Sequence, residues 1–487
     1  MNGTQQIYER ARLSRDARFD GHFFVGVRTT GIYCRPICPA NAPKSENVRF
    51  FPTAAAASEA GFRPCLRCRP ECAPGTPAWS GTSTTVRRGL RLIAEGALDE
   101  GNVEDLSKRL GVTSRHLRRL FNQHLGASPL AVAHTQRLHF AKTLIDQTML
   151  PMRDIAIAAG FGSTRRFNDT FRKIYGRTPR QLRQRQSGSA ATNTFTVRLP
   201  YRQPFDYGAL LEFFSARAVQ GIERVEGGRY LRTVAIGDEH GIIDVRDACD
   251  ALILQLHGIE TSSLIAGVQR VRELFDLDAP IADIHAVLSD DSDLKNLIER
   301  HPGVRVPGAW DGFELTVRAI LGQQVSVKAA TTLAGRIAAR YGESVNVPVD
   351  GIRQAPDRLF PVPHRLRRAR LESLGIIGSR ARTIRAVASA VAEGQLHFDG
   401  AQGADEFAAR LLSIKGIGEW TAQYVAMRAL KNPDAFPAAD LGLLRAFDVD
   451  GRERLRPTEL ARRAEEWRPW RAYAALLLWG KTPTAGG

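Results

Sequence analysis

Apolar residues recur at different intervals along this 487-residue chain, and the intervals separate it into regions. Phe195, Val197 and Leu199 alternate with polar residues, which is the period of a half-buried β-strand. From about residue 281 onward, the apolar residues follow the three-to-four-residue spacing of amphipathic helices. The pattern therefore predicts strands that begin near residue 195 and a helical region that follows them.

A helical unit occurs twice in the part of the chain before these strands. Leu106–Gly111 is echoed by Ile155–Gly160, at an offset of 49 residues. Further echoes follow at an offset of 50 residues, in the pairs Leu117/Phe167, Phe121/Phe171, Gly126/Gly176 and Pro129/Pro179. Gly111 ends the first helix of the unit, and Thr113 or Ser114 caps the next. Each copy thus reads as helix, tight turn and helix, which predicts a double helix-turn-helix.

Two stretches rich in small and polar residues, 73–85 and 186–194, read as linkers. The predicted domains are a first module at 1–72, the double helix-turn-helix at 86–185, an α+β subdomain at 195–280 and a helical domain at 281–483. The expected fold class is multidomain and mainly α, with α+β parts, because a chain of this length exceeds a single core.

Basic residues are concentrated in the helix-turn-helix segment. The whole chain carries a formal charge of +17, and residues 85–185 hold 19 basic against 8 acidic residues. A solvated basic surface would explain the excess, but a basic helix after a tight turn also fits the major groove of DNA. The arginines expected on the exposed faces of the two second helices are Arg115, Arg118, Arg119, Arg165 and Arg166.

Four of the six cysteines form two close pairs, Cys34-x3-Cys38 and Cys65-x2-Cys68, separated by 26 residues. Four sulfur atoms at such spacing fit a tetrahedral Zn²⁺ site, with one ion per chain. No apolar run is long enough to cross a membrane and the first residues lack a signal core, so we expect a cytoplasmic, nucleoid-associated protein without membrane contacts. Paired cysteines there bind metal more often than they form disulfides. A purely structural zinc knuckle is the alternative.

The residues around the cysteines, VRTTGIYCRPICPA and GFRPCLRC, are similar to the N-terminal domain of the Ada family of methyl-phosphotriester repair proteins, over residues 8–72. The resemblance implies that Cys34 accepts a methyl group from an alkylated DNA phosphate, and that Thr30 and Arg63 contact DNA. Two further family contacts fall on Pro39 and Asn41, which are not basic. Methylation would turn one of four thiolates into a thioether and lower the negative charge of the site, which weakens its repulsion of phosphates.

Residues 86–185 resemble the AraC/XylS family of transcriptional activators, and Ada-type regulators combine such a domain with the zinc module. The resemblance implies a promoter operator in double-stranded DNA as one partner and RNA polymerase as another.

The stretch FAARLLSIKGIGEWTAQYVAMRALKNPDAFPAAD reads as a helix-hairpin-helix, in which Gly416 and Gly418 let backbone N–H groups approach a DNA phosphate. Such a hairpin alone indicates a DNA-binding module. Asp440 follows Gly418 by 22 residues. This arrangement resembles the helix-hairpin-helix glycosylases, and the flanking residues resemble 3-methyladenine DNA glycosylase II of the AlkA type over about 195–483. The resemblance implies that the Asp440 carboxylate stabilises an oxocarbenium-like transition state and orients water; an N-cap role for Asp440 is the structural alternative.

By the same resemblance, Trp420, Tyr424 and Trp479 form the pocket for a flipped-out cationic base, although they would also be ordinary core aromatics. Trp420 occupies the position of the Schiff-base lysine of bifunctional glycosylases, so hydrolysis without strand cleavage is expected. Gln324 takes the place of a leucine wedge. No C-terminal cysteine cluster exists for an iron–sulfur centre, and the Pro-Cys-His-Arg string of alkylguanine acceptors is absent.

The predicted function is therefore a bifunctional response to DNA alkylation. One half would accept methyl groups and activate transcription, and the other would excise alkylated purines such as 3-methyladenine by hydrolysis. Two alternatives remain open: a transcriptional regulator whose glycosylase-like domain is inactive, and a zinc-stabilised fusion without methyl transfer.

Overall fold

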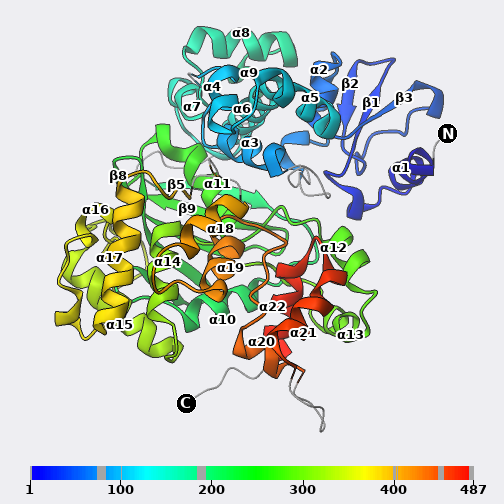
Figure 1. The fold of residues 1–487 in the computed structure, drawn as a ribbon. Helices are drawn as coiled ribbons and strands as arrows, with labels where there is room; N and C mark the ends of the chain where they lie inside the picture. The colour runs from blue at the N-terminus through cyan, green and yellow to red at the C-terminus, as the bar shows by residue number, and fades with distance from the viewer. Residues whose placement is uncertain are drawn as a thin grey trace. The chain divides into compact units, whose positions relative to one another are not determined.

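The computed structural model describes residues 3–73, 84–99, 101–183, 194–398, 402, 404–447 and 455–481. Most of the two predicted linkers, at 74–83 and 186–193, lies outside these residues. The chain divides into two compact units (Figure 1). The first contains Met1–Arg202, Ala248–Gln269 and Leu277–Ala279, and the second contains the remaining segments, Gln203–Asp247, Arg270–Asp276 and Pro280–Gly487.

The N-terminal module of the first unit is built on a four-stranded sheet in the order β3-β1-β2-β4. Its elements are α1 (Gly3–Leu13), β1 (Phe24–Val27), β2 (Ile32–Cys34), β3 (Val48–Phe51), α2 (Ala54–Glu59) and β4 (Arg63–Pro64). β1 pairs antiparallel with β2 and β3, whereas β2 pairs in parallel with β4. Phe24, Tyr33 and Phe51 are buried beneath the sheet together with the alanines of α2.

A helical segment follows within the same unit. Its helices are α3 (Thr84–Ala94), α4 (Val103–Arg109), α5 (Ser114–Leu125), α6 (Pro129–Gln147), α7 (Met152–Ala158), α8 (Thr164–Tyr175) and α9 (Pro179–Leu182). The pairs α4–α5 and α7–α8 are the two predicted copies of the helix-turn-helix, and α6 connects them. Because α3 begins at Thr84, the end of the first predicted linker is helical.

The repeat in the sequence corresponds to repeated helix caps. Thr113 and Ser163 accept hydrogen bonds as N-caps of α5 and α8. Gly126 and Gly176 end the same two helices, each with φ of +67°, a conformation that favours glycine. The buried faces of α5 and α8 match as well, with Leu117, Leu120, Phe121 and Leu125 in one and Phe167, Phe171 and Tyr175 in the other.

Strands follow the helix-turn-helix segment, as the alternating pattern predicts. β5 (Thr194–Pro200) pairs antiparallel with β9 (Ala251–His257), and both strands belong to the first unit. β7 (Arg229–Ile236) pairs antiparallel with β6 (Glu223–Glu226) and β8 (Glu239–Asp247), and these three belong to the second unit.

The second unit is otherwise mainly helical. Its helices, with α11 shared between the two units, are α10 (Tyr207–Ala216), α11 (Leu264–Leu274), α12 (Ile281–Leu288), α13 (Ser292–Arg300), α14 (Gly312–Leu321), α15 (Val327–Tyr341), α16 (Pro363–Leu366), α17 (Gly378–Ala392), α18 (Ala404–Leu412), α19 (Glu419–Arg428), α20 (Leu441–Arg445), α21 (Pro457–Arg463) and α22 (Arg471–Lys481).

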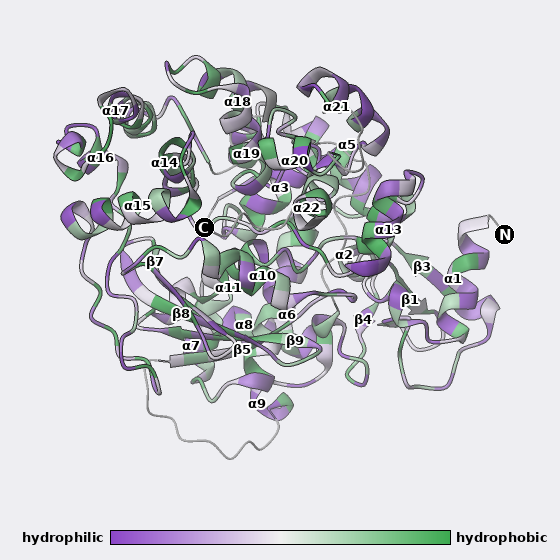
Figure 2. Ribbon diagram, turned by 90° about the horizontal axis from the view of Figure 1, so that it is seen from below, coloured by the Kyte–Doolittle hydropathy of each residue, from purple (hydrophilic) through white to green (hydrophobic). Residues whose placement is uncertain are grey.

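Helices α14, α15, α17 and α19 bury their apolar sides in one core, where Val317, Ile337, Ile384 and Val425 are fully buried. Hydrophobic and hydrophilic residues alternate along α15, as they do in an amphipathic helix (Figure 2). Within the described residues, no helix combines the length and the apolar composition that crossing a bilayer requires.

Candidate active site and zinc centre

The hairpin between α18 and α19 contains the two predicted glycines. Gly416 has φ of +97°, and a Cβ atom there would lie 2.1 Å from Oγ1 of Thr383. Gly418 is the N-cap of α19, and both glycines are exposed. Backbone conformation and close packing thus both require glycine at 416, and the exposed hairpin leaves the N-terminus of α19 accessible to an anion.

Asp440 lies at the N-terminus of α20, where the N-cap alternative is confirmed. Its Oδ1 accepts hydrogen bonds from the backbone N–H groups of Gly442, at 2.8 Å, and Leu443, at 3.1 Å. Capping fixes the carboxylate to a rigid helix end.

Capping is not the whole role of this carboxylate, because two indole rings also donate to it. Nε1 of Trp420 on α19 lies 2.7 Å from Asp440 Oδ2, and Nε1 of Trp479 on α22 lies 2.8 Å from Oδ1. Three helices that are distant in the sequence therefore converge on one half-buried carboxylate. Four N–H groups thus fix the position and orientation of the Asp440 carboxylate.

The three aromatic residues predicted for the base pocket lie together. The rings of Trp420 and Tyr424 stack with centroids 5.2 Å apart and planes 10° from parallel. The Tyr424 and Trp479 centroids are 6.4 Å apart, at 59°. The structure thus brings the predicted base-binding residues together beside the predicted catalytic residue, Asp440. We call the three rings, Trp420, Tyr424 and Trp479, the aromatic cluster.

The sequence analysis did not single out Arg428, whose guanidinium contacts Tyr424 of this cluster. Its Nη1 donates to the Tyr424 hydroxyl at 2.5 Å, while its other nitrogens bind the carbonyls of Pro307 and Gly308, each at 2.9 Å. Burial raises the pKa of the Tyr424 phenol, but the charges of Arg428 and Arg217 outweigh burial, and the pKa lies below its ordinary value.

Trp420→Phe should separate the two roles of this indole. Phenylalanine keeps an aromatic face but loses the N–H that holds Asp440 Oδ2. We expect single-turnover base release to fall by more than about tenfold, the effect of losing one hydrogen bond to a charged group. The rates are measured with saturating enzyme on a lesion-containing duplex. An unchanged rate would show that stacking alone matters at this position.

The predicted wedge residue, Gln324, lies in the turn between α14 and α15. Its side chain is exposed, and its backbone adopts φ of +56°, which is uncommon for a residue with a side chain. The preceding residue, Gln323, contacts the hairpin. The turn therefore lies beside the segment predicted to bind phosphate.

The cysteine cluster follows from strand register in the N-terminal module. Parallel pairing sets Ile32 opposite Arg63 and Tyr33 opposite Pro64, so Cys34 and Cys65 leave the two strands side by side. The amide of Cys65 donates to the carbonyl of Tyr33 at 3.0 Å. Turns after each strand return Cys38 and Cys68 to the same point.

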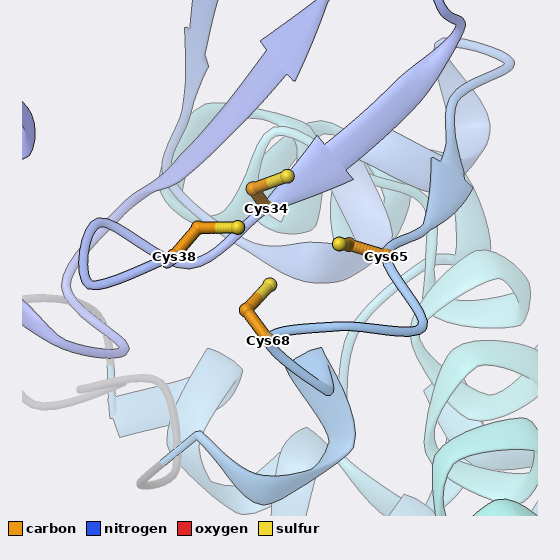
Figure 3. Close-up of side chains that lie close together, drawn as sticks. All are labelled: Cys34, Cys38, Cys65 and Cys68. Atoms are coloured by element: carbon orange, nitrogen blue, oxygen red, sulfur yellow. The ribbon is translucent and has the colours of Figure 1, made fainter. Parts of the chain in front are cut away.

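The four sulfur atoms are turned toward a common centre (Figure 3) and lie within 4.8 Å of one another. Zinc at its usual Zn–S distance places tetrahedral sulfurs about 3.8 Å apart, so the four cysteines fit one Zn²⁺ ion. Cys65 and Cys68 are buried, whereas Cys34 and Cys38 are partly exposed. The two remaining cysteines, Cys72 and Cys249, lie outside the cluster.

The two predicted DNA contacts of this module lie at the ends of β2 and β4, the strands that lead to Cys34 and Cys65. Thr30 is exposed in the turn between β1 and β2, and Arg63 is exposed at the start of β4. The carbonyl of Gly31 accepts a hydrogen bond from the Arg63 amide at 2.8 Å, which holds the two segments together. The segments that carry the two predicted contacts are therefore joined by a backbone hydrogen bond.

Residues next to the zinc ligands also contact α6, which the sequence did not indicate. The hydroxyl of Tyr33 and Nε2 of His139 lie 2.8 Å apart, and burial lowers the pKa of His139 to about 4. Arg69 forms an ion pair with Asp146 at 2.5 Å. The zinc module and the helix that connects the two helix-turn-helix copies therefore pack as one body within the first unit.

All five arginines predicted on the recognition helices α5 and α8 are exposed. Arg118 pairs with Glu104 at 3.1 Å, and Arg165 lies 3.9 Å from Asp169. Exposed pairs of this kind contribute little to stability, so exchanging them for DNA phosphates costs little. Both helices thus expose arginine side chains, as helices that bind in the major groove of DNA do.

Comparison with known proteins gives each region a relative. Residues 8–71 match the family "Metal binding domain of Ada", 106–185 the "Helix-turn-helix domain", 196–311 the "AlkA N-terminal domain" and 317–472 the "HhH-GPD superfamily base excision DNA repair protein".

A protein of Mycobacterium tuberculosis, "Probable bifunctional transcriptional activator/DNA repair enzyme AlkA", is 43% identical over 475 residues, which cover 96% of this chain and 95% of that protein. The "DNA-3-methyladenine glycosylase 2" of Escherichia coli K12 is 32% identical over 288 residues, covering 58% of this chain and 95% of that protein. A solved 3-methyladenine DNA glycosylase of Archaeoglobus fulgidus shares the fold, with a TM-score of 0.50 and 23% identity over 58% of this chain and 97% of its own.

Fold, sites and family matches define a multidomain DNA-repair protein in which an Ada-type zinc module and a double helix-turn-helix precede a base-excision glycosylase domain. Similarity to the M. tuberculosis protein extends over nearly the whole length of both chains. The chain belongs to the family of bifunctional transcriptional activator/DNA repair enzymes of the AlkA type.

Proposed function

We propose that this protein hydrolyses the glycosidic bond of alkylated purines in duplex DNA, 3-methyladenine among them. The observation that carries the proposal is the position of the Asp440 carboxylate, which both indoles of the aromatic cluster hold beside the helix-hairpin-helix. An electron-rich cluster next to a carboxylate suits a cationic base whose sugar acquires positive charge as the bond breaks.

The hydrogen bonds of Asp440 assign different tasks to its two oxygens. Oδ1 accepts from Gly442, Leu443 and Trp479, so its acceptor capacity is used. Among the residues that the structure describes, Oδ2 accepts from Trp420 alone, which leaves it a lone pair for another donor. We assign Oδ2 as the atom that orients the attacking water and faces the oxocarbenium-like sugar.

The leaving group needs little protonation, because alkylation of a ring nitrogen already makes the purine cationic. The stacked rings of Trp420 and Tyr424 favour such a base over a neutral one, because electron-rich aromatic faces attract cations. Since Trp420 stands where bifunctional glycosylases place their lysine, the reaction ends with an abasic site in an unbroken strand.

Base release from a panel of duplex oligonucleotides tests this proposal. The panel contains 3-methyladenine, 7-methylguanine, hypoxanthine and undamaged purines, and free bases are separated chromatographically. We expect release from the cationic lesions and intact strands before alkaline treatment. Absence of release from every lesion would favour the alternative, a DNA-binding regulator whose glycosylase domain is inactive.

We further propose that Cys34 accepts a methyl group from DNA methyl-phosphotriesters in a single turnover, and that the methylated protein activates transcription through operator DNA and RNA polymerase. Partial exposure of Cys34 supports its role as the nucleophile, and burial argues against Cys65 and Cys68. Cys38 is partly exposed as well, so exposure alone does not distinguish Cys34 from Cys38. The resemblance to the Ada family favours Cys34 as the acceptor.

Mass spectrometry decides between these two thiols. After incubation with methyl-phosphotriester DNA, we expect one added methyl group per chain, on the peptide that contains Cys34. Cys34→Ser should abolish the added mass, while Cys249→Ser, a change of an exposed cysteine outside the cluster, should leave it intact. A methyl group on Cys38 would reverse the assignment, and no methyl group would leave a structural zinc module.

A further inference from the structure

The turn that contains Gln324 is hydrogen-bonded to the hairpin through the side chain of Gln323. Nε2 of Gln323 lies 3.0 Å from the carbonyl oxygen of Gly416 and 3.2 Å from Oγ1 of Thr421. Gly416 belongs to the hairpin, and Thr421 belongs to the first turn of α19. One amide group, with its two N–H donors, therefore joins three segments of the second unit.

Helix α17 holds the same two segments from another side. The guanidinium of Arg380 donates a hydrogen bond to the backbone carbonyl of Gln323. One turn further, Oγ1 of Thr383 donates to the carbonyl of Lys415 at 2.9 Å. The turn that contains Gln323 and Gln324 and the hairpin are thus both hydrogen-bonded to α17 as well as to each other.

These contacts explain how Gln324 keeps its unusual backbone. A left-handed conformation of a residue with a side chain persists when its surroundings determine it, and it tends to occur at functional positions. The side chain of Gln324 is exposed, so its backbone conformation is held by the hydrogen bonds of its neighbour Gln323. Thr421 directly follows Trp420, so the hydrogen bond between Gln323 and Thr421 also fixes the position of Gln324 relative to the aromatic cluster.

We infer that Gln323 is a positioning residue for base flipping, which holds Gln324 at a fixed place relative to the hairpin and to Trp420. When the hairpin binds a phosphate, the backbone of Gln324 is then already ordered, and less loop entropy is lost at insertion. This inference rests on the proposed glycosylase function and on the wedge role of Gln324.

The test compares a lesion opposite its normal partner with the same lesion in an unpaired bulge, where flipping costs less. Gln323→Met keeps the length of the side chain but removes both donors. In the full-length protein, single-turnover release from the paired lesion should fall about tenfold, the effect of one ordinary hydrogen bond, and release from the bulge should fall much less. Equal losses on both substrates would overturn the inference, because they would indicate damage to Asp440 or the aromatic cluster.

Three further variants keep the outcomes distinct. Thr421→Val removes the hydroxyl that accepts from the Gln323 amide. It should also slow release from the paired lesion more than from the bulge, by a smaller factor than Gln323→Met does. The test therefore does not depend on how well Gln323→Met folds. Gln324→Ala should also slow the paired lesion selectively, and the double variant with Gln323→Met should be no slower than Gln324→Ala alone. Fully multiplicative losses would refute the coupling. If Gln324→Ala releases base from both substrates at the wild-type rates, Gln324 is not the wedge. If the wild-type protein releases no base from either substrate, the proposed function is wrong.

Discussion

Asp440→Asn slows base release from a 3-methyladenine duplex by about 10²-fold or more, if the carboxylate acts as we propose. The amide has the same shape, but it carries no charge to stabilise the sugar cation. One of its two ends also becomes an NH₂ donor, which cannot accept from Trp420 or Trp479, both of which now donate to the carboxylate. Single-turnover rates and the affinity for an abasic-site duplex are measured side by side.

We expect the affinity for the abasic duplex to change little, so the loss appears in the chemical step rather than in binding. Glu406→Gln is the matched control, since it removes one exposed carboxylate from α18 of the same domain. That variant should release base at the wild-type rate. Equal rates for Asp440→Asn and wild type would take Asp440 out of the mechanism.

Replacing Cys65 with serine should have the largest effect on the N-terminal module. A structural Zn²⁺ site of this kind contributes binding free energy of about 10–16 kcal/mol in isolated zinc modules, and loss of one buried thiolate forfeits much of it. We expect the zinc content, measured by plasma mass spectrometry, to fall from one ion per chain to well below one. Cys249→Ser should retain the full zinc content.

The loss should spread to the helix-turn-helix, because Phe24, Tyr33 and Phe51 share one buried cluster with Leu117 and Phe121. Operator or non-specific duplex binding by the first unit should therefore weaken together with zinc content. Base release should persist, since the aromatic cluster lies in the second unit. Loss of zinc without loss of DNA affinity would show that the helix-turn-helix folds independently of the zinc module.

Most of the secondary structure could be predicted from local patterns in the sequence. The positions of α5 and α8 followed from caps, glycines and an apolar stripe, which act within a few residues and are repeated in both copies. The cysteine spacing predicted a metal site for the same reason, since each pair of ligands is local. Domain boundaries and the roles of individual site residues remain predictions that the experiments above address.

What the sequence determined by itself was the set of modules and the residue types that bear chemistry: four cysteines, two hairpin glycines, one aspartate and three aromatic residues. Tertiary structure alone decided how they meet. Trp420 and Trp479 are 59 positions apart, and only the packing of α19 and α22 brings both indoles to Asp440. Gln323 and Arg428 carry no signal in the sequence, because hydrogen bonds to distant backbone carbonyls depend on where the chain folds back and not on any local pattern.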